Sequence, residues 1–256
     1  NLHLVKTYRS SSDQINLQNL PIRNPEMGAP IRSCFIPRKG NCIAEIDYSG
    51  LEFTIAGCIT NDPAIRKYVK EGGDPHRDMA LLVFCVRQKS VSRQMRYCGK
   101  NQFVFPILYG SYYKSCAPVL WNSINQMNLE YKDALLYKHL KDQGITQLGN
   151  LESNDPKPGT FLHHLKECER KYTKVKFKKC FSVQRNAYES YQKTGQIRYA
   201  TGFVAGGILS RNDVFNWRIQ GPAFHCLLWS LIELNKWLKK NKMKTKIVGQ
   251  IHDSII

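Results

Sequence analysis

The sequence predicts an α+β fold in which both ends of the chain contribute to one antiparallel sheet and a helical lobe is inserted between them. Two observations lead to this prediction. Runs of β-type residues lie near both ends of the chain, and apolar residues in the middle recur at helical spacing. A chain of 256 residues with 42% hydrophobic content is long and apolar enough to bury a sizeable core, in one large domain or two small ones.

The N-terminal part is predicted to hold turns followed by two short strands. Residues 1–30 are polar and rich in turn-forming residues, so we expect loops there. The runs Ile31–Pro37 and Cys42–Tyr48 flank the tetrapeptide Arg38-Lys39-Gly40-Asn41, a pattern that is typical of a β-hairpin.

Helices are predicted to fill the middle of the chain. From Leu51 the apolar residues recur at helical spacing until Asn61-Asp62-Pro63 ends that helix, and Ser90–Tyr109 has the pattern of a longer one. Gly99 and Pro106 inside the longer helix predict a kink or bulge. Further helical patterns cover His76–Val86, Lys132–Lys141, Thr173–Lys193 and Ile219–Leu238, with a Gly/Asn/Pro-rich connector at Gln147–Thr160.

The charge of the chain indicates a polyanionic partner. Lys and Arg number 38 against 20 Asp and Glu, which gives a net charge of +18. Nucleic acid is the first candidate and an anionic membrane surface the second, but the basic residues are spread along the chain and no apolar stretch is long enough to span a bilayer. Nine cysteines without a Cys-x-x-Cys pair predict reduced, buried thiols and a cytoplasmic location, in the host cytoplasm if the source is viral.

Two aspartates follow apolar strand-like runs. Asp47 ends the run Cys42–Ile46, and Asp253 follows Thr245–Ile251 after one histidine. If the two strands are neighbours, the carboxylates can hold a pair of Mg²⁺ ions of the kind used for in-line phosphoryl transfer. The alternative is that each is an ordinary aspartate in a turn.

A cationic helix offers a second functional element. Arg96 and Lys100 are four residues apart, so they lie near one helical face, and the aromatic residues Phe103, Phe105 and Tyr109 follow. Cations can neutralise a triphosphate, and an aromatic ring can stack on a base. The alternative is a solvated basic face with aromatic residues in the core.

Three separated segments resemble the three polymerase motifs of the DNA polymerase I family (family A). Asp47-Tyr48-Ser49-Gly50-Leu51-Glu52 resembles the first, Arg96-x-x-x-Lys100 with Phe105 and Tyr109 the second, and Gln250-Ile251-His252-Asp253 the third. Four further segments resemble parts of the family that flank these motifs, namely residues 9–13, 16–23, 74–76 and 216–221. The resemblance therefore covers nearly the whole chain. The tract 103–106 and the long segment after Tyr109 look most like phage-type members.

The sequence departs from the family pattern at two places. Lys100 and Tyr109 are nine residues apart, one more than usual, which leaves open whether Phe103 or Phe105 contacts the nucleotide; the spacing to Tyr109 favours Phe105. In the third motif Ser254 stands where the family usually has Glu.

The resemblance implies a right-hand polymerase fold. Residues 1–60 and 206–256 would form the palm, an antiparallel sheet, and residues 61–205 the fingers, with the second motif on a helix at about 90–109. The chain lacks an initiator Met, so we expect an excerpt of a longer protein. We further expect the thumb to be absent from this chain and the second palm segment to be truncated at its C-terminus.

The implied activity is template-directed addition of deoxynucleotides to a primer 3′-hydroxyl in DNA replication, a nucleotidyltransferase reaction. Asp47 and Asp253 would bind two Mg²⁺ together with the carbonyl of Tyr48, and Lys100 would be catalytic. The implied nucleotide contacts are Glu52 (as a steric gate against ribonucleotides), His76, Arg96, Lys100, Phe105 and Tyr109. The implied DNA contacts are Arg9, Asn16, Gln18, Asn19, Asn216, Gln220 and His252.

The implied partners are primer–template DNA and deoxynucleoside triphosphates, with no membrane. We expect a monomer, and a processivity partner stays open. Three alternatives remain at this stage: a single-subunit RNA polymerase, which Glu52 disfavours; a non-catalytic DNA-binding remnant; and, third, a two-metal nuclease, which would leave the cationic helix unexplained.

Overall fold

The computed structural model describes residues 2–13, 16, 18, 25–126 and 129–256. The chain divides into two compact units. The first comprises Asn1–Ile55, Gln196–Gly206 and Trp217–Ile256, and the second comprises Ala56–Gly195 and Gly207–Asn216. Helices and antiparallel strands are combined in the described chain, so the predicted α+β class is confirmed at this level. The names palm and fingers, and their boundaries at residues 60 and 206, stay predictions.

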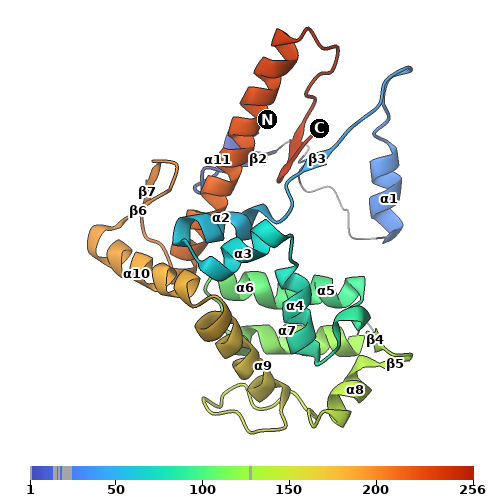
Figure 1. The fold of residues 1–256 in the computed structure, drawn as a ribbon, viewed down its shortest axis with the longest axis vertical. Coiled ribbons are helices and arrows are strands. Elements are labelled where there is room, and N and C mark those ends of the chain that lie inside the picture. Colours follow the sequence, from blue (N-terminus) through green and yellow to red (C-terminus); the bar gives the residue numbers. More distant parts are fainter. Residues whose placement is uncertain (1, 14–15, 17, 19–24, 127–128) are drawn as a thin grey trace. The chain divides into compact units, whose positions relative to one another are not determined.

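The first unit contains the sheet that carries both predicted aspartates. Strands β3 (Ile46–Asp47), β8 (Gln250–Ile251) and β9 (Ser254–Ile255) form an antiparallel sheet in the order β3-β9-β8. In Figure 1 the blue strand β3 lies next to the red C-terminal end of the chain. Segments more than 200 positions apart in the chain therefore pair, as the sequence predicted.

The remaining elements of the first unit are two hairpins and the helices next to the sheet strands. They are β1 (Leu2–Leu4), β2 (Ser10–Ser12), α1 (Pro25–Ser33), the start of α2 (Leu51–Thr60), β6 (Gln196–Arg198), β7 (Val204–Gly206) and most of α11 (Arg211–Lys240). Ile255 of β9 packs in a core cluster with Phe224 and Leu227 of α11, and this contact fixes β9 on the helix.

The predicted hairpin between Ile31–Pro37 and Cys42–Tyr48 is wrong. Its turn does form, since the Asn41 N–H donates to the Arg38 carbonyl at 2.9 Å, but no ladder flanks it within residues 34–45, all of which are described. Pro25 at the first helical position instead begins α1, because proline is preorganised for a helix start, and the loops expected over residues 1–30 give way to α1 and the β1–β2 hairpin. The second run pairs with β9 rather than locally.

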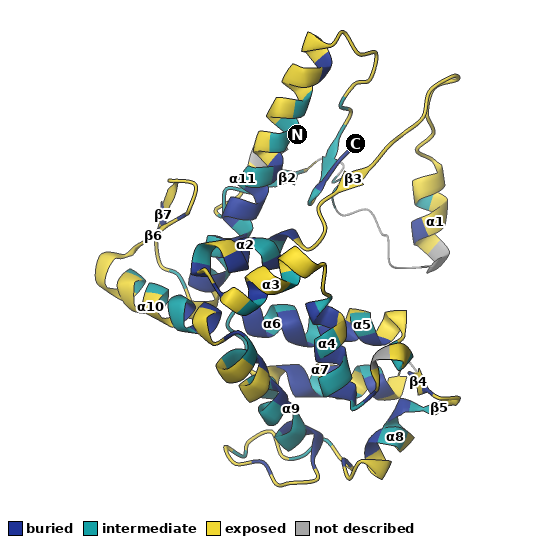
Figure 2. Ribbon diagram, viewed as in Figure 1, coloured by how far each residue is buried: buried dark blue, intermediate teal, exposed yellow. Residues whose placement is uncertain are grey.

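The second unit is helical. Its α-helices are α3 (Pro63–Glu71), α4 (Pro75–Phe84), α5 (Arg93–Gly99), α6 (Phe105–Leu108), α7 (Tyr113–Gln126), α8 (Leu136–Asp142), α9 (Phe161–Arg170) and α10 (Lys178–Thr194). Shorter elements are the 3₁₀ turn Gln88–Ser90, the π-helices η3 (Lys100–Val104) and η4 (Lys171–Lys176), and the strands β4 (Glu130–Tyr131) and β5 (Ala134–Leu135). Figure 2 shows that the buried residues of this unit gather along α4, α6 and α7.

Close packing and one shared cap hold the helices of this unit together. A Cβ added at Gly99 of α5 would lie 3.1 Å from the Cβ of Ala80 in α4, so glycine permits the two helices to approach. The carboxylate of Asp62 caps α3 by accepting from the Ala64 and Ile65 amides, and its second oxygen accepts from the Cys180 amide of α10 at 2.8 Å. The helix boundary predicted at Asn61-Asp62-Pro63 is therefore confirmed.

The cysteines and the helix lengths bear on two sequence-based expectations. Cys34, Cys42 and Cys58 are exposed, so the expectation of uniformly buried thiols is wrong for these three. Within the described ranges, no helix combines the length and apolar character needed to cross a bilayer.

Candidate functional site

Asp47 lies at the end of β3, and Asp253 lies in the turn that leads into its neighbour β9. Asp47 ends β3 and is paired with Ser254 of β9, and the Tyr48 N–H donates to the Asp253 carbonyl at 3.2 Å. Asp253 is the second residue of the two-residue turn between β8 and β9, and His252 before it has a φ of 51°, in the left-handed region. The predicted convergence of the two strands is confirmed, while the role of their carboxylates stays a prediction.

The donor set at this place fits a hard divalent cation. Carboxylate and carbonyl oxygens are the ligands that Mg²⁺ prefers, and Mg²⁺ sites in enzymes commonly use one or two protein carboxylates with water and substrate phosphates completing the shell. Asp47 is exposed, so such ligands can reach it. In the described part of the chain, no group of three or more His, Cys, Asp or Glu side chains is arranged for a metal, so the two carboxylates would rely on these outside ligands.

A polar network joins the N-terminal segment to the third motif. Gln18 Nε2 donates to the hydroxyl of Ser10 at 3.0 Å and to Gln250 Oε1 at 3.2 Å. Asn16 Oδ1 accepts from the Ser12 hydroxyl at 2.9 Å. The predicted DNA contact Gln18 therefore belongs to a network with Gln250, and the predicted contact Asn16 lies beside it. The sequence alone did not assign a role to Gln250. Asn19, also predicted to contact DNA, lies outside the described residues.

The other predicted DNA contacts lie on several elements of the chain. Arg9 Nη1 lies 3.9 Å from Glu52 Oε1, and these side chains are 26% and 16% exposed. The first turn of α2 therefore presents Glu52 as a partly buried carboxylate held beside a cation, which differs from a freely solvated helix-start Glu. Asn216 and Gln220 are one turn apart on α11 and share a helical face.

The predicted nucleotide contacts of the second unit form an aromatic and cationic cluster. The rings of Phe105 and Tyr109 are stacked with centroids 5.8 Å apart and an interplanar angle of 7°. The His76 ring lies 5.3 Å from that of Phe105, and Lys100 Nζ lies 5.3 Å from the Phe105 centroid. Arg96 Nε donates to Asp74 Oδ2 at 2.6 Å, so Asp74 orients the guanidinium.

The π-helix η3 accounts for the additional residue between Lys100 and Tyr109. The Phe105 N–H donates to the Lys100 carbonyl, a bond from residue i+5 to residue i that takes up one residue more than an α-turn. Phe103 is fully buried, with its ring 6.0 Å from that of Tyr172, while Phe105 is partly exposed beside Lys100. This geometry favours Phe105 over Phe103 as a nucleotide contact, and the bulge predicted from Gly99 and Pro106 is confirmed.

Burial and cations alter the protonation of His76. The pKa of His76 is lowered from an ordinary value of 6.5 to about 4. Burial is the largest cause, and the positive charges of Lys100 and Arg96 lower the pKa further. The imidazole is therefore neutral at pH 7. It can give or take a hydrogen bond there, but it carries no charge toward a phosphate.

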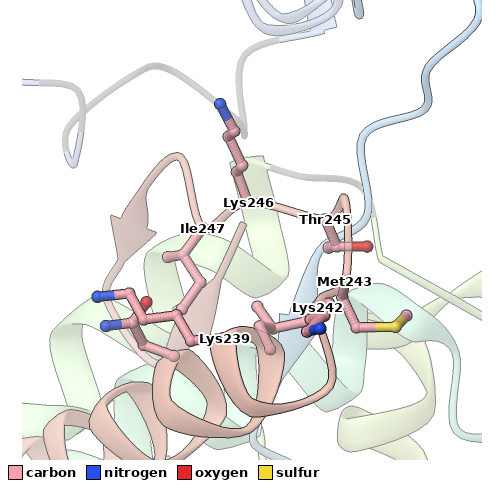
Figure 3. A pocket seen from close by; sticks show the side chains of 8 residues that line it. Lys239, Lys242, Met243, Thr245, Lys246 and Ile247 are labelled. Carbon is pink, nitrogen blue, oxygen red and sulfur yellow. The ribbon is translucent and has the colours of Figure 1, made fainter.

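A pocket of about 560 Å³ lies at the C-terminal end of α11 (Figure 3). Its lining includes the cations Lys239, Lys242 and Lys246 and the apolar residues Leu238, Met243 and Ile247. Cations at a helix C-terminus interact favourably with the helix dipole, and Lys246 extends away from the helix end. None of the predicted site residues lines this pocket, so it is separate from the predicted metal and nucleotide contacts.

Comparison with known proteins identifies the family. The model of the family described as "DNA polymerase family A" matches residues 1–256 of this chain. DNA polymerase I of Lactococcus lactis is 28% identical over 254 residues, covering 99% of this chain and 26% of its own length. The DNA polymerase of Bacillus phage SP01 is 26% identical over 277 residues, covering 100% of this chain and 26% of its own length. Bacterial and phage relatives match at similar identity, so the phage-type subgroup stays a prediction.

A solved structure shares the fold. The POL domain of Pol1 from M. smegmatis, in complex with DNA primer-template and dNTP, superposes with a TM-score of 0.71 at 21% identity and covers 98% of this chain and 39% of its own. The chain spans about a quarter of the length of the curated relatives it matches. Because the family match extends over every residue, this chain belongs to DNA polymerase family A.

Proposed function

We propose that this chain carries the catalytic region of a template-directed DNA polymerase, which adds deoxynucleotides to a primer 3′-hydroxyl and releases pyrophosphate. The observation that carries the proposal is the pairing of β3 with β9 in a chain of family A, which sets Asp47 opposite Ser254, the residue that follows Asp253. The names of the relatives support it, as does the binding of DNA primer-template and dNTP by the M. smegmatis domain.

In this proposal Asp47, Asp253 and the carbonyl of Tyr48 hold two Mg²⁺ ions. When bound there, the ions would lower the pKa of the primer 3′-hydroxyl and stabilise the charge on the leaving group. The protein contributes the end of β3 and the turn between β8 and β9, which the pairing of Asp47 with Ser254 brings next to each other. The exposure of Asp47 leaves room for phosphate and water ligands.

The cluster around Phe105 would bind the incoming deoxynucleoside triphosphate. Arg96 and Lys100 would neutralise phosphate charge, and Lys100 would donate a proton to the departing pyrophosphate. His76 would donate a hydrogen bond to a phosphate oxygen, and before the nucleotide binds its pKa of about 4 leaves the imidazole neutral at pH 7. The stacked rings of Phe105 and Tyr109 would offer a flat surface to the base.

The remaining predicted contacts complete the proposal. Glu52 would exclude a ribose 2′-hydroxyl, and its ion pair with Arg9 would hold it in place. Arg9, Asn16, Gln18, Asn19, Asn216, Gln220 and His252 would contact the primer–template duplex. The palm and fingers assignment, the absent thumb, the monomeric state, a processivity partner and the cytoplasmic location stay predictions.

Replacement of either aspartate tests the proposal. Asp47→Ala and Asp253→Ala should each lower primer extension at least about a hundredfold, since each removes a ligand of the metal ions that would stabilise the developing negative charge. Asp155→Ala is the matched control, because its side chain is 97% exposed and pairs only with Lys166 among the ion pairs of the described residues. Extension that persists in both strand-end variants would contradict the assignment.

A further inference from the structure

Strand β3 is held on the sheet without apolar anchoring. It is two residues long, and both Ile46, at 65% exposure, and Asp47 face solvent. The ladder to β9 consists of two residue pairs. Because the faces of a strand alternate with every residue, a slip by one position would turn Asp47 to the opposite face, and register is weakly specified where no side chain is buried.

Strand β9, in contrast, is fixed. Ile255 is 7% exposed and packs on Phe224 and Leu227, and Ser254 is 2% exposed. The position of Asp47 beside Asp253 therefore depends on the polar contacts that tie β3 to this fixed neighbour.

One of these contacts comes from a residue outside the three motifs. The Ser254 hydroxyl donates to Glu45 Oε1 at 2.9 Å, across 209 positions of sequence. The carbonyl of Ile251 lies 2.8 Å from the same hydroxyl, so one proton has two acceptors within reach. A hydrogen bond to a carboxylate is stronger than one to a neutral carbonyl, which favours Glu45 as the acceptor.

We propose that Glu45 is a positioning residue for the Asp47–Asp253 pair, because its hydrogen bond with the buried Ser254 sets the register of β3 on β9. Glu45 precedes Asp47 by two residues, so the contact lies directly next to the ladder pair that contains Asp47. It also gives a role to Ser254, the residue at which the third motif departs from the family pattern. The inference rests on the proposed function in one respect, namely that the two aspartates bind divalent metal.

Amide hydrogen exchange at Tyr48 tests the register directly. Its N–H donates to the Asp253 carbonyl, so its protection reports the pairing of the strands. Glu45→Ala and Ser254→Ala should each speed exchange at Tyr48 at least about fivefold, and the double variant should add little, since both remove the same bond. Glu45→Gln, whose neutral oxygen competes with the Ile251 carbonyl for the same proton, should speed exchange less than Glu45→Ala does. Unchanged exchange in Glu45→Ala would overturn the proposal.

The binding of Mn²⁺ alone, measured by electron paramagnetic resonance of the free ion, tests the consequence for the aspartates. Glu45→Ala should weaken Mn²⁺ binding about tenfold, the size expected when a residue that orients a ligand is removed. Glu45→Gln, which keeps a weaker acceptor, should lie between Glu45→Ala and the parent. Equal weakening in Glu45→Ala and Glu45→Gln, with Ser254→Ala unaffected, would make Glu45 a direct ligand and overturn the positioning role.

Two controls separate this inference from the proposed function. Glu233→Ala removes a carboxylate on α11 that is paired with Lys236 at 2.8 Å, and it should leave both exchange and Mn²⁺ binding unchanged. Asp47→Ala should abolish Mn²⁺ binding at the pair. If it does not, the metal assignment of the proposed function fails, and the exchange data still decide whether Glu45 sets the register.

Discussion

The neutral imidazole of His76 gives the chain a specific dependence of stability on pH. The pKa of His76 is about 4 in the folded state against an ordinary 6.5, so the unfolded chain binds more protons between these values. Stability therefore rises with pH through this window and is lost as the pH falls from about 6.5 to 4. The two-to-three-unit shift corresponds to about 3 kcal/mol when it is expressed in full.

His76→Gln should remove this dependence. Urea unfolding at pH values from 4 to 7 should show a free energy of unfolding that falls more steeply toward acid in the parent than in the variant. The difference between the two slopes should approach the value for one proton taken up on unfolding. His163→Gln, at a histidine for which α9 provides a partly exposed position, is the control and should keep the parental slope. Equal slopes in the parent and His76→Gln would contradict a buried neutral imidazole.

Glu52 should determine the choice between sugars. Glu52→Ala should raise incorporation of ribonucleotides relative to deoxynucleotides at least about tenfold, because the proposed steric exclusion of the 2′-hydroxyl is lost. The ratio of kcat/KM for the two nucleotides measures it. Arg9→Ala should shift the ratio in the same direction but less, since it loosens the carboxylate without removing it. Glu71→Ala, at an exposed residue of α3, is the matched control.

The two kinds of site residue differ in how far the sequence predicts them. Asp47 and Asp253 can be found because a carboxylate at the end of an apolar run is visible in the local sequence. The bond between Glu45 and Ser254 cannot, because it depends on which distant strands pair and in what register. The protonation of His76 is likewise hidden, since it results from burial and from two cations, Arg96 on α5 and Lys100 on η3.

The π-helix η3 predicts an unusual tolerance to deletion. After removal of Asn101, Phe105 would follow Lys100 by four positions, which is the spacing of an α-turn. The buried residues Phe103 and Val104 would keep their positions relative to Phe105. The free energy of unfolding should change by less than about 1.5 kcal/mol. Urea denaturation measures it.

Deletion of Phe103 is the matched comparison. It shortens the segment by the same one residue but removes a fully buried ring, and it should cost about 3–5 kcal/mol. If both deletions lowered the free energy of unfolding equally, the π-helix η3 would not be the place that accommodates the additional residue.

The errors of element prediction have one physical cause. The run Ile31–Pro37 has strand-like composition, yet α1 covers its first half and no ladder forms beside the turn at Arg38–Asn41. Composition reports local preference, whereas a strand needs a partner, and the partner of β3 lies at the other end of the chain. Helices α7 and α9 were not predicted, although Cys116, Leu120 and Ile124 recur at a spacing of four on α7.

The net charge of +18 predicts how DNA binding should respond to salt. Association with primer–template DNA should weaken by about 10³-fold or more between 50 and 200 mM salt, if at least about six phosphates are neutralised, because condensed cations are released from the duplex. Fluorescence anisotropy of a labelled duplex at several salt concentrations measures the slope. An uncharged oligonucleotide analogue of the same sequence is the control, and affinity for DNA that does not change with salt would contradict a phosphate-dominated interface.

The fold class could be predicted from the sequence because it depends on patterns that extend over many residues. Strand-like runs at 42–48 and 245–251 and helical periodicity between them are sufficient for an α+β prediction with a sheet built from both ends. The division into two units with boundaries near residues 55, 195, 206 and 216 depends on contacts between distant segments, which composition does not report.

The wide turn after Lys100 also matters for anyone who compares this chain with its relatives position by position. Counting four residues from Lys100, as in a regular helix, leads to Val104, a fully buried aliphatic side chain. Such an alignment would set Val104 where the resemblance to the second motif implies an aromatic ring. With a one-residue gap placed between Lys100 and Phe105, the comparison would instead set Phe105 and Tyr109 against the aromatic pair that the resemblance to the second motif implies.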